Sequence, residues 1–405
     1  MQRRTVVIFA MSERGHMETL LPLVSGLAAL GASTHVFTDR RFEREIRAAG
    51  AAFHDLYAGR PLATADDASS PFPCRYVSFA GVFADDVLRE VAPLRPDVIV
   101  YETFAVIGRV VGAALSIPYV NVGWGHAVEP EVHLHALASD PRVRTADACR
   151  RAVASLRERS GCADASEFAY ITGLSPFLNV QCEPPEIVSE APRARLEPVA
   201  FFGSLPVLEG RAASTAAPGR PYFAPDAKLR IYASFGTVVW TYYTAEALAA
   251  LAAVAAYTAR HAGTAALVGL GDAPLAPQAI ASLERRGVTV LAYPDQWQAL
   301  READLFVTHH GLRSTHEAIY HRVPMLGYPF FSDQPAFSRR CAALGLSIPL
   351  ALEPRAPIDE SVIESAIERY RGAREAMAIR LSEARAWEIA TYARRPDVCR
   401  RILEL

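Results

Sequence analysis

Residues 303–334 read ADLFVTHHGLRSTHEAIYHRVPMLGYPFFSDQ, and this stretch decides the fold. The apolar run at 305–307 predicts a short buried strand that ends at two histidines, and Gly311 then opens a predicted helix. Val323–Pro329 predicts the next strand. The order of strand, helix and strand is that of a βαβ unit, which builds a parallel sheet with helices packed against it.

The first turn of this predicted helix suits an anion. Backbone N–H groups at a helix N-terminus have no partner inside the helix, and the helix dipole adds partial positive charge there. Arg313 stands in that turn, and a guanidinium can hold a phosphate with two parallel hydrogen bonds. Open α/β sheets bind phosphorylated ligands at such turns, at the carboxyl ends of their strands. The stretch therefore predicts a phosphate-binding site.

Composition restricts the class of protein. The chain has 405 residues, is 51% hydrophobic and 21% charged, and carries a formal net charge of −2. It is long enough for two domains, and its charge gives no reason to expect nucleic acid or an anionic membrane as a partner. The six cysteines have no metal-binding or disulfide spacing, so we expect reduced thiols in a cytoplasmic protein. The apolar runs are too short for a signal peptide or a membrane span.

Strand candidates recur along the chain with helical stretches between them, which predicts an α/β protein with parallel sheets. The candidates are too many for one sheet of ordinary width, so we expect two Rossmann-like domains. A stretch rich in Ser, Pro, Ala and Gly marks a linker at 206–225, between domains at 1–205 and 226–384. The candidate strands are Thr5–Ala10, Thr34–Thr38, Asp97–Tyr101, Pro118–Val122, Phe177–Gln181, Val199–Gly203, Leu229–Ser234, Ala265–Leu270, Val288–Ala292, Asp304–Thr308, Pro324–Pro329 and Ser347–Leu350.

A histidine and a glutamate are expected at the carboxyl edge of the first sheet. His16 follows the first predicted strand, at the start of a helix whose leucines recur at helical spacing. An imidazole can accept a proton near neutral pH, and a carboxylate on its other nitrogen would fix the tautomer. Glu102 follows the third predicted strand and is placed to supply that carboxylate. From the residues alone, a helix-start histidine and an ordinary exposed glutamate remain the alternative.

Several motifs resemble those of GT-B glycosyltransferases of the UDP-glucuronosyl/glucosyltransferase family, including bacterial natural-product and macrolide glycosyltransferases. The donor signature of that family runs roughly T-H-G-G-x-N-S-x-x-E, then G-V-P-x-x-x-x-P, then D-Q. His310 stands where the family has its second glycine, and Arg313 stands where it has asparagine. The matching residues are Thr308, His309, Gly311, Ser314, Glu317, Pro324, Pro329, Asp333 and Gln334.

The resemblance extends to three shorter motifs. The first is G-H-x-x-P-x-L-P-L, where the family keeps its catalytic histidine. The second is an S-x-G-T turn near the diphosphate, and the third is W-x-P-Q, whose aromatic ring stacks on the nucleobase. Asp295 replaces the proline of the third motif. The matching residues are Gly15, His16, Leu21, Pro22, Leu23, Ser234, Gly236, Thr237, Tyr293 and Gln296.

The resemblance implies a GT-B fold with two Rossmann-like domains whose parallel sheets face a central cleft. It implies that the N-terminal domain, completed by a C-terminal helix at 385–405, binds the acceptor and that the C-terminal domain binds the donor. The implied reaction is an inverting, metal-independent transfer of a sugar from a UDP- or dTDP-sugar to a hydroxyl or other nucleophile. The implied acceptor is a small hydrophobic natural product. No cofactor is implied, and we expect a monomer or homodimer.

Catalytic roles for His16 and Glu102 are implied by the same resemblance. The implied donor-binding residues are Ser234, Gly236, Thr237, Tyr293, Gln296, His309, His310, Gly311, Arg313, Ser314, Glu317, Asp333 and Gln334. Segments 54–83 and 124–137 are predicted to be irregular and to shape the acceptor pocket through Phe79, Phe83, Trp124 and His126. The histidines near 126–135 fit no specific metal site.

Two accounts of Arg313 remain open. In the first it contacts the diphosphate and compensates for the bulk of His310 near the phosphates. In the second its side chain turns outward to solvent or pairs with a nearby carboxylate such as Glu317, which lies at helical i,i+4 spacing.

Two other functions also remain open. One is a nucleotide-sugar epimerase on the same scaffold, which would turn over the donor alone. The other is a non-catalytic auxiliary partner of a glycosyltransferase. No G-x-G-x-x-G follows a predicted strand and no Asp-x-Asp is present, which disfavours a dinucleotide oxidoreductase and the metal-dependent glycosyltransferase fold.

Overall fold

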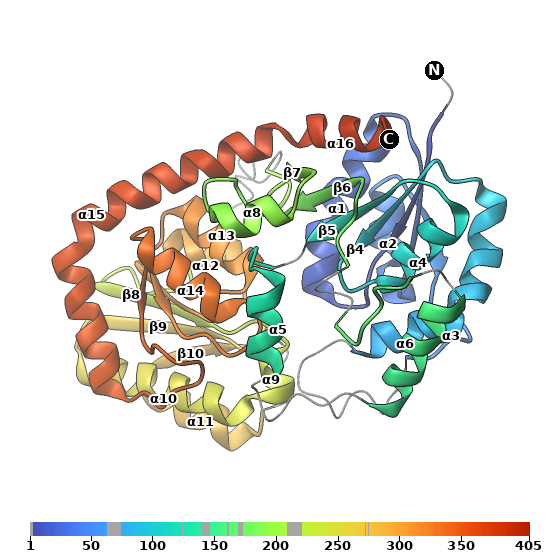
Figure 1. Cartoon of the computed structure of the whole chain (residues 1–405). Coiled ribbons are helices and arrows are strands. Elements are labelled where there is room, and N and C mark those ends of the chain that lie inside the picture. Colours follow the sequence, from blue (N-terminus) through green and yellow to red (C-terminus); the bar gives the residue numbers. More distant parts are fainter. Residues whose placement is uncertain are drawn as a thin grey trace. The chain divides into compact units, whose positions relative to one another are not determined.

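A computed structural model describes residues 3–62, 74–123, 125–138, 146–159, 162–168, 173–208, 221–271, 273 and 275–405. The chain divides into two compact units, each built around one parallel sheet (Figure 1). Unit 1 comprises Met1–Pro206 and Ala390–Leu405, and unit 2 comprises Val207–Ile389.

Unit 1 contains a seven-stranded sheet in the order β3-β2-β1-β4-β5-β6-β7, and every neighbouring pair is parallel. Its strands are β1 (Thr5–Phe9), β2 (Ser33–Thr38), β3 (Ala52–Asp55), β4 (Val98–Glu102), β5 (Tyr119–Gly123), β6 (Leu178–Gln181) and β7 (Val199–Phe201). Its helices are α1 (Arg14–Ala29), α2 (Glu43–Ala48), α3 (Cys74–Val91), α4 (Val106–Leu115), α5 (Pro130–Ala138), α6 (Asp147–Arg159), α8 (Glu190–Arg195) and α16 (Arg395–Leu403).

Unit 2 contains a six-stranded parallel sheet in the order β10-β9-β8-β11-β12-β13. Its strands are β8 (Leu229–Ser234), β9 (Thr264–Gly269), β10 (Val288–Leu291), β11 (Leu305–Thr308), β12 (Met325–Gly327) and β13 (Ser347–Pro349). Its helices are α9 (Val239–Tyr242), α10 (Thr244–Arg260), α11 (Pro277–Glu284), α12 (Gln296–Glu302), α13 (Leu312–His321), α14 (Gln334–Ala343) and most of α15 (Glu360–Ala393).

The central strands of both sheets are buried on both faces. β1 (TVVIF), β4 (VIVYE) and β11 (LFVT) are buried almost throughout. A parallel sheet covered by helices requires continuous apolar strands rather than alternating ones, and these sequences provide them. α1 lies on its sheet through a helical stripe of buried residues: Met17, Leu20, Leu23, Val24 and Leu27.

The strand order reverses once in each sheet. In unit 1 the reversal lies between β1 and β4, and in unit 2 it lies between β8 and β11. Ligands of open α/β sheets bind beyond the carboxyl ends of the strands at such a reversal. His16 and Glu102 follow or end the two strands in unit 1, and Ser234 and His309 do so in unit 2.

The last helix packs on the first. Arg395 of α16 donates hydrogen bonds to the carbonyl oxygens of Phe202 (2.9 Å) and Leu205 (2.6 Å) in unit 1. A side chain on Gly26 of α1 would lie 2.8 Å from Sγ of Cys399, so the two helices approach closely. Within the described ranges, no helix has the length and apolarity needed to cross a membrane.

The prediction of two parallel α/β sheets is confirmed, and each predicted strand overlaps an observed one. The prediction of irregular structure at 54–83 and 124–137 is partly wrong, because α3 and α5 lie in these segments. α3 has weak local signals, with aromatic and β-branched residues and Gly81 in its interior. Packing explains it: a side chain on Gly81 would lie 2.5 Å from Cβ of Ala152 on α6, so the two helices touch there.

Candidate active site

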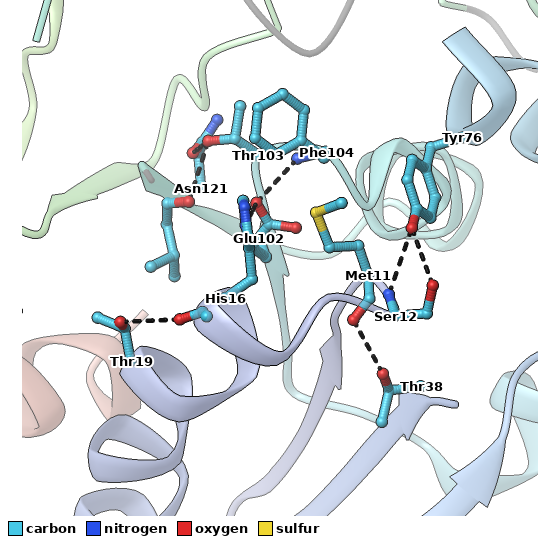
Figure 2. A network of polar contacts seen from close by, with 12 residues as sticks. Met11, Ser12, His16, Thr19, Thr38, Tyr76, Glu102, Thr103, Phe104 and Asn121 are labelled. Carbon is cyan, nitrogen blue, oxygen red and sulfur yellow. Dashed lines mark hydrogen bonds and ion pairs between the residues drawn. The ribbon is translucent and has the colours of Figure 1, made fainter. Parts of the chain in front are cut away.

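His16 and Glu102 meet where the strand order of unit 1 reverses. His16 lies in the first turn of α1, directly after β1, and Glu102 is the last residue of β4. Nδ1 of His16 lies 3.1 Å from Oε1 of Glu102 (Figure 2). The Glu102 side chain is fully buried, whereas the His16 side chain is 23% exposed. The structure therefore brings together two residues that are 86 positions apart in the sequence and that were each expected just after a strand.

The contacts of Glu102 favour one tautomer of the His16 imidazole. Oε1 also accepts a hydrogen bond from the backbone N–H of Phe104 at 3.3 Å, and the Phe104 ring meets the His16 ring edge-on at 5.3 Å. Oε2 is buried and has no hydrogen-bond partner among the described residues. A carboxylate oxygen accepts hydrogen bonds, so its contact with Nδ1 favours the tautomer that has its proton on Nδ1 and its acceptor lone pair on Nε2. This is the tautomer that a general base requires.

Residues that sequence reasoning missed hold the loop between β1 and α1. The Ser12 and Tyr76 hydroxyl groups are 3.0 Å apart, and Thr38 Oγ1 donates to the Met11 carbonyl oxygen at 3.2 Å (Figure 2). Burial raises the pKa of Tyr76, which keeps its hydroxyl protonated. Tyr76 lies on α3, and the failure to predict that helix hid its approach to the loop.

The predicted acceptor-binding residues lie in different surroundings. Phe79, on α3, is 3% exposed and packs in the core against Tyr57 at 5.2 Å and Phe83 at 5.0 Å. Trp124 lies outside the described residues. His126 follows β5 and is buried beside the carboxylate of Glu183.

His126 belongs to a second histidine–glutamate pair at the same edge of the sheet. Its Nδ1 lies 2.7 Å from Oε1 of Glu183, a fully buried residue just beyond β6. Glu183 also accepts from the Ala127 N–H and the Gln181 amide, each at 2.8 Å. Sequence reasoning singled out His126 but not Glu183, since nothing local links residues 57 positions apart.

In unit 2, the turn after β8 and the turn after β11 enclose the His309 ring. A side chain on Gly236 would lie 2.9 Å from Nε2 of this ring, and one on Gly311 would lie 2.3 Å from it. Gly236 has φ of +71°, which also favours glycine. Burial lowers the pKa of His309 to about 4, so the ring is neutral at neutral pH. Nδ1 is buried without a hydrogen-bond partner among the described residues.

His310 turns away from this turn. It has φ of +59° and is fully buried, with Nε2 2.9 Å from the Ser347 hydroxyl and Nδ1 3.3 Å from the Thr315 hydroxyl. The ring fills the core beside β13, and the expectation that its bulk lies near the phosphates stays a prediction. A side chain on Gly327 would meet this ring at 2.7 Å, so Gly327 makes room for it.

The first turn of α13 carries a polar network with α12. Glu317 is fully buried; its Oε1 accepts from Nε of Arg313 at 2.7 Å and its Oε2 from the Gln296 amide at 2.7 Å. The Ser314 hydroxyl donates to the side-chain amide oxygen of Gln296 at 3.2 Å. The guanidinium thus pairs with Glu317, which favours the second account of Arg313, and contact with a diphosphate stays a prediction. Gly311, the N-cap of α13, has no side chain to cap the N–H groups of that turn.

Four further residues of the expected donor site lie at the carboxyl edge of this sheet. Tyr293 follows β10 and is 55% exposed. Asp295 caps α12 by accepting from the N–H groups of Trp297 (3.0 Å) and Gln298 (3.4 Å). Asp333 is the N-cap of α14, and the side-chain oxygen of Gln334 accepts from the Phe330 N–H at 2.9 Å, within its own loop. Thr237 follows the Gly236 turn before α9.

Comparison with solved structures identifies the class of the fold. The calicheamicin glycosyltransferase CalG4 superposes with a TM-score of 0.74 at 21% identity, over 100% of this chain and 99% of that one. The spinosyn rhamnosyltransferase SpnG complexed with thymidine diphosphate superposes with a TM-score of 0.63 at 19% identity, over 99% and 100%. The fold is therefore that of the GT-B glycosyltransferases.

Sequence comparison finds a local match to one family and a distant relative. Residues 291–367 match the model of the UDP-glucoronosyl and UDP-glucosyl transferase family. The zeaxanthin glucosyltransferase of Pantoea ananas is 27% identical over 271 residues, which are 62% of this chain and 60% of that protein's length. This stretch contains the donor-signature motifs, so the similarity to the family lies where those motifs predicted it.

Proposed function

We propose that the protein transfers a sugar from a UDP- or dTDP-sugar to a hydroxyl group of a small hydrophobic natural product, with inversion and without a metal ion. The observation that carries the proposal is the His16–Glu102 pair at the strand reversal of unit 1. A partly exposed imidazole with a buried carboxylate on Nδ1 has the tautomer and the accessibility of a general base.

His16 acts on the acceptor in this proposal. Its Nε2 takes the hydroxyl proton as the acceptor oxygen forms a bond to the anomeric carbon. The bond from that carbon to the diphosphate oxygen breaks, and the electron pair leaves with the diphosphate. Glu102 holds the ring in orientation and stabilises the imidazolium that forms. Attack opposite the leaving group inverts the configuration.

Unit 2 binds the nucleotide diphosphate. The leaving group gains negative charge, which the uncapped N–H groups of α13 stabilise where it develops. His309 is neutral and contributes through hydrogen bonding and shape rather than through charge. The exposed Tyr293 ring offers an apolar face to a nucleobase. The spinosyn rhamnosyltransferase SpnG, which has the same fold, has been solved in complex with thymidine diphosphate, and this supports the same class of donor here.

The names of the relatives support the acceptor class. The similar proteins include a zeaxanthin glucosyltransferase and a calicheamicin glycosyltransferase, whose acceptors are natural products. In unit 1, the predicted acceptor residues Phe79 and Phe83 contribute aromatic surface next to Tyr57. Phe79 is largely buried, so in this proposal it supports the residues that line the acceptor pocket and has little contact with the acceptor itself.

The test incubates the purified protein with panels of UDP- and dTDP-sugars and hydrophobic alcohols and phenols, and reads products by mass spectrometry. We expect an acceptor mass increased by one hexose or deoxyhexose, with release of the nucleotide diphosphate. Conversion of the donor to an isomer without any acceptor would instead indicate an epimerase. Binding of donor without turnover in any combination would indicate a non-catalytic auxiliary subunit.

A further inference from the structure

Tyr222 contacts both ends of α12, although 73 residues separate it from the first of these contacts. Its hydroxyl oxygen accepts a hydrogen bond from the backbone N–H of Asp295, the N-cap of α12, at 2.9 Å. Its own backbone N–H donates to Oε2 of Glu302, the last residue of α12, at 2.8 Å. The residue therefore lies along the short helix and is bonded to it at both ends.

The bond at the N-terminal end depends on the replacement at position 295. Proline, the residue of the motif that this stretch resembles, has no N–H and cannot donate to Tyr222. Asp295 supplies that N–H, and its carboxylate also caps α12. Its φ of −65° is one that proline also adopts, so the backbone at this position suits either residue in φ.

The loop that Tyr222 contacts lies at one side of the sheet. It follows β10, which is the edge strand of the sheet in the described part of the chain. On the inner side Pro294 packs on β9, where a side chain on Gly269 would lie 3.0 Å from Cγ of Pro294. The Tyr222 hydroxyl fixes the next residue along the loop, Asp295.

This loop carries the residues that we assign to the nucleoside. Tyr293 lies two positions before Asp295, and Gln296 lies one position after it as the first residue of α12. Gln296 in turn bonds to Glu317 and Ser314 of α13. A shift of Asp295 would therefore move the stacking ring and the first residue of the α12–α13 network together.

We propose that Tyr222 is a positioning residue for the nucleoside part of the donor, acting through the backbone of Asp295 on Tyr293 and Gln296. The proposal rests on the proposed function, because it takes the edge of unit 2 as the nucleotide site. It assigns Tyr222 no contact with the diphosphate, whose turns after β8 and β11 lie on other strands.

Calorimetric titration with UDP, dTDP and inorganic pyrophosphate tests the proposal. Tyr222→Phe removes only the hydroxyl group, and a single hydrogen bond of this kind changes affinity by about 2- to 10-fold. We expect that loss for UDP and dTDP and none for pyrophosphate. Unchanged nucleotide affinity, or an equal loss for pyrophosphate, would overturn the proposal.

Two backgrounds at position 295 make the test specific. Asp295→Pro removes the donor N–H, so Tyr222→Phe should have no further effect on UDP or dTDP affinity there. Asp295→Asn keeps both the N–H and a capping oxygen, so Tyr222→Phe should keep its full effect. If Tyr222→Phe changed nucleotide affinity equally in both backgrounds, Tyr222 would not act through its hydrogen bond with the Asp295 N–H. If the wild type binds neither UDP nor dTDP, the proposed function is rejected. If it binds them but the variants show no such differences in affinity, only the role of Tyr222 is rejected.

Discussion

Each unit carries a histidine where its strand order reverses, but the two histidines have different surroundings. His16 is partly exposed and has a buried carboxylate at 3.1 Å from Nδ1. His309 is 8% exposed, and no acidic group is among the causes of its lowered pKa of about 4. The same topological position therefore holds a candidate proton acceptor in one unit and a neutral, space-filling ring in the other. Topology selects the edge of the sheet, and the neighbouring side chains determine the chemistry there.

The largest effect is expected at His16. His16→Ala removes the proposed base and should lower turnover by about 10²- to 10⁴-fold, the usual contribution of a general base. Affinity for UDP or dTDP should be nearly unchanged, because the donor residues lie in unit 2. Steady-state kinetics with calorimetry measures both, and near-normal turnover on an alcohol acceptor would reject the assignment.

A smaller effect, on stability, is expected when the space around the His309 ring is reduced. Gly311→Ala places a methyl group 2.3 Å from Nε2 of His309, and such overpacking costs about 1–3 kcal/mol of unfolding free energy. The backbone at Gly311 has φ of −64°, so alanine causes no backbone strain. Gly15→Ala in unit 1 is the matched control, since nothing lies within 4 Å of its added methyl group. Denaturant unfolding of both variants compares them, and equal stabilities would show that the His309 ring is not fixed between the glycines.

The pH dependence of stability tests whether His309 is buried as a neutral ring. The folded pKa of His309, about 4, lies below the unfolded value of 6.5, so the unfolded state binds more protons between these values. The stabilisation is complete above pH 6.5 and is lost as the pH falls toward 4. We expect this ring to account for a loss of about 2 kcal/mol between pH 7.5 and 5. Urea unfolding at both pH values should show a smaller loss in His309→Asn, and an identical loss would contradict the burial of a neutral ring.

The smallest effect is expected at Arg313. Its guanidinium pairs with the buried Glu317 carboxylate at i,i+4 spacing, and Glu317 keeps the Gln296 amide as a partner without it. Arg313→Ala should therefore weaken UDP or dTDP binding by less than about 5-fold. Direct contact with the diphosphate predicts about 10- to 150-fold instead, with nucleoside binding unaffected. Calorimetric titration with diphosphate and nucleoside decides between them.

The sequence predicted those features that depend on short stretches. Buried strands such as Val98–Glu102 have continuous apolar runs, and the Arg313–Glu317 pair follows from helical spacing. Features that depend on distant packing escaped prediction. α3 is specified by its contact with α6 at Gly81, and the direction of the His310 ring is set by the space left at Gly327.

The central claim is that His16 and Glu102 act as one unit, and a double-mutant cycle tests it directly. Turnover is measured for the wild type, His16→Ala, Glu102→Gln and the double variant. Glu102 acts only through the imidazole in this account, so Glu102→Gln should lower turnover in the wild type, by less than His16→Ala does, and have no further effect in the His16→Ala background. Equal losses from Glu102→Gln in both backgrounds would contradict the pairing and leave Glu102 with a separate role.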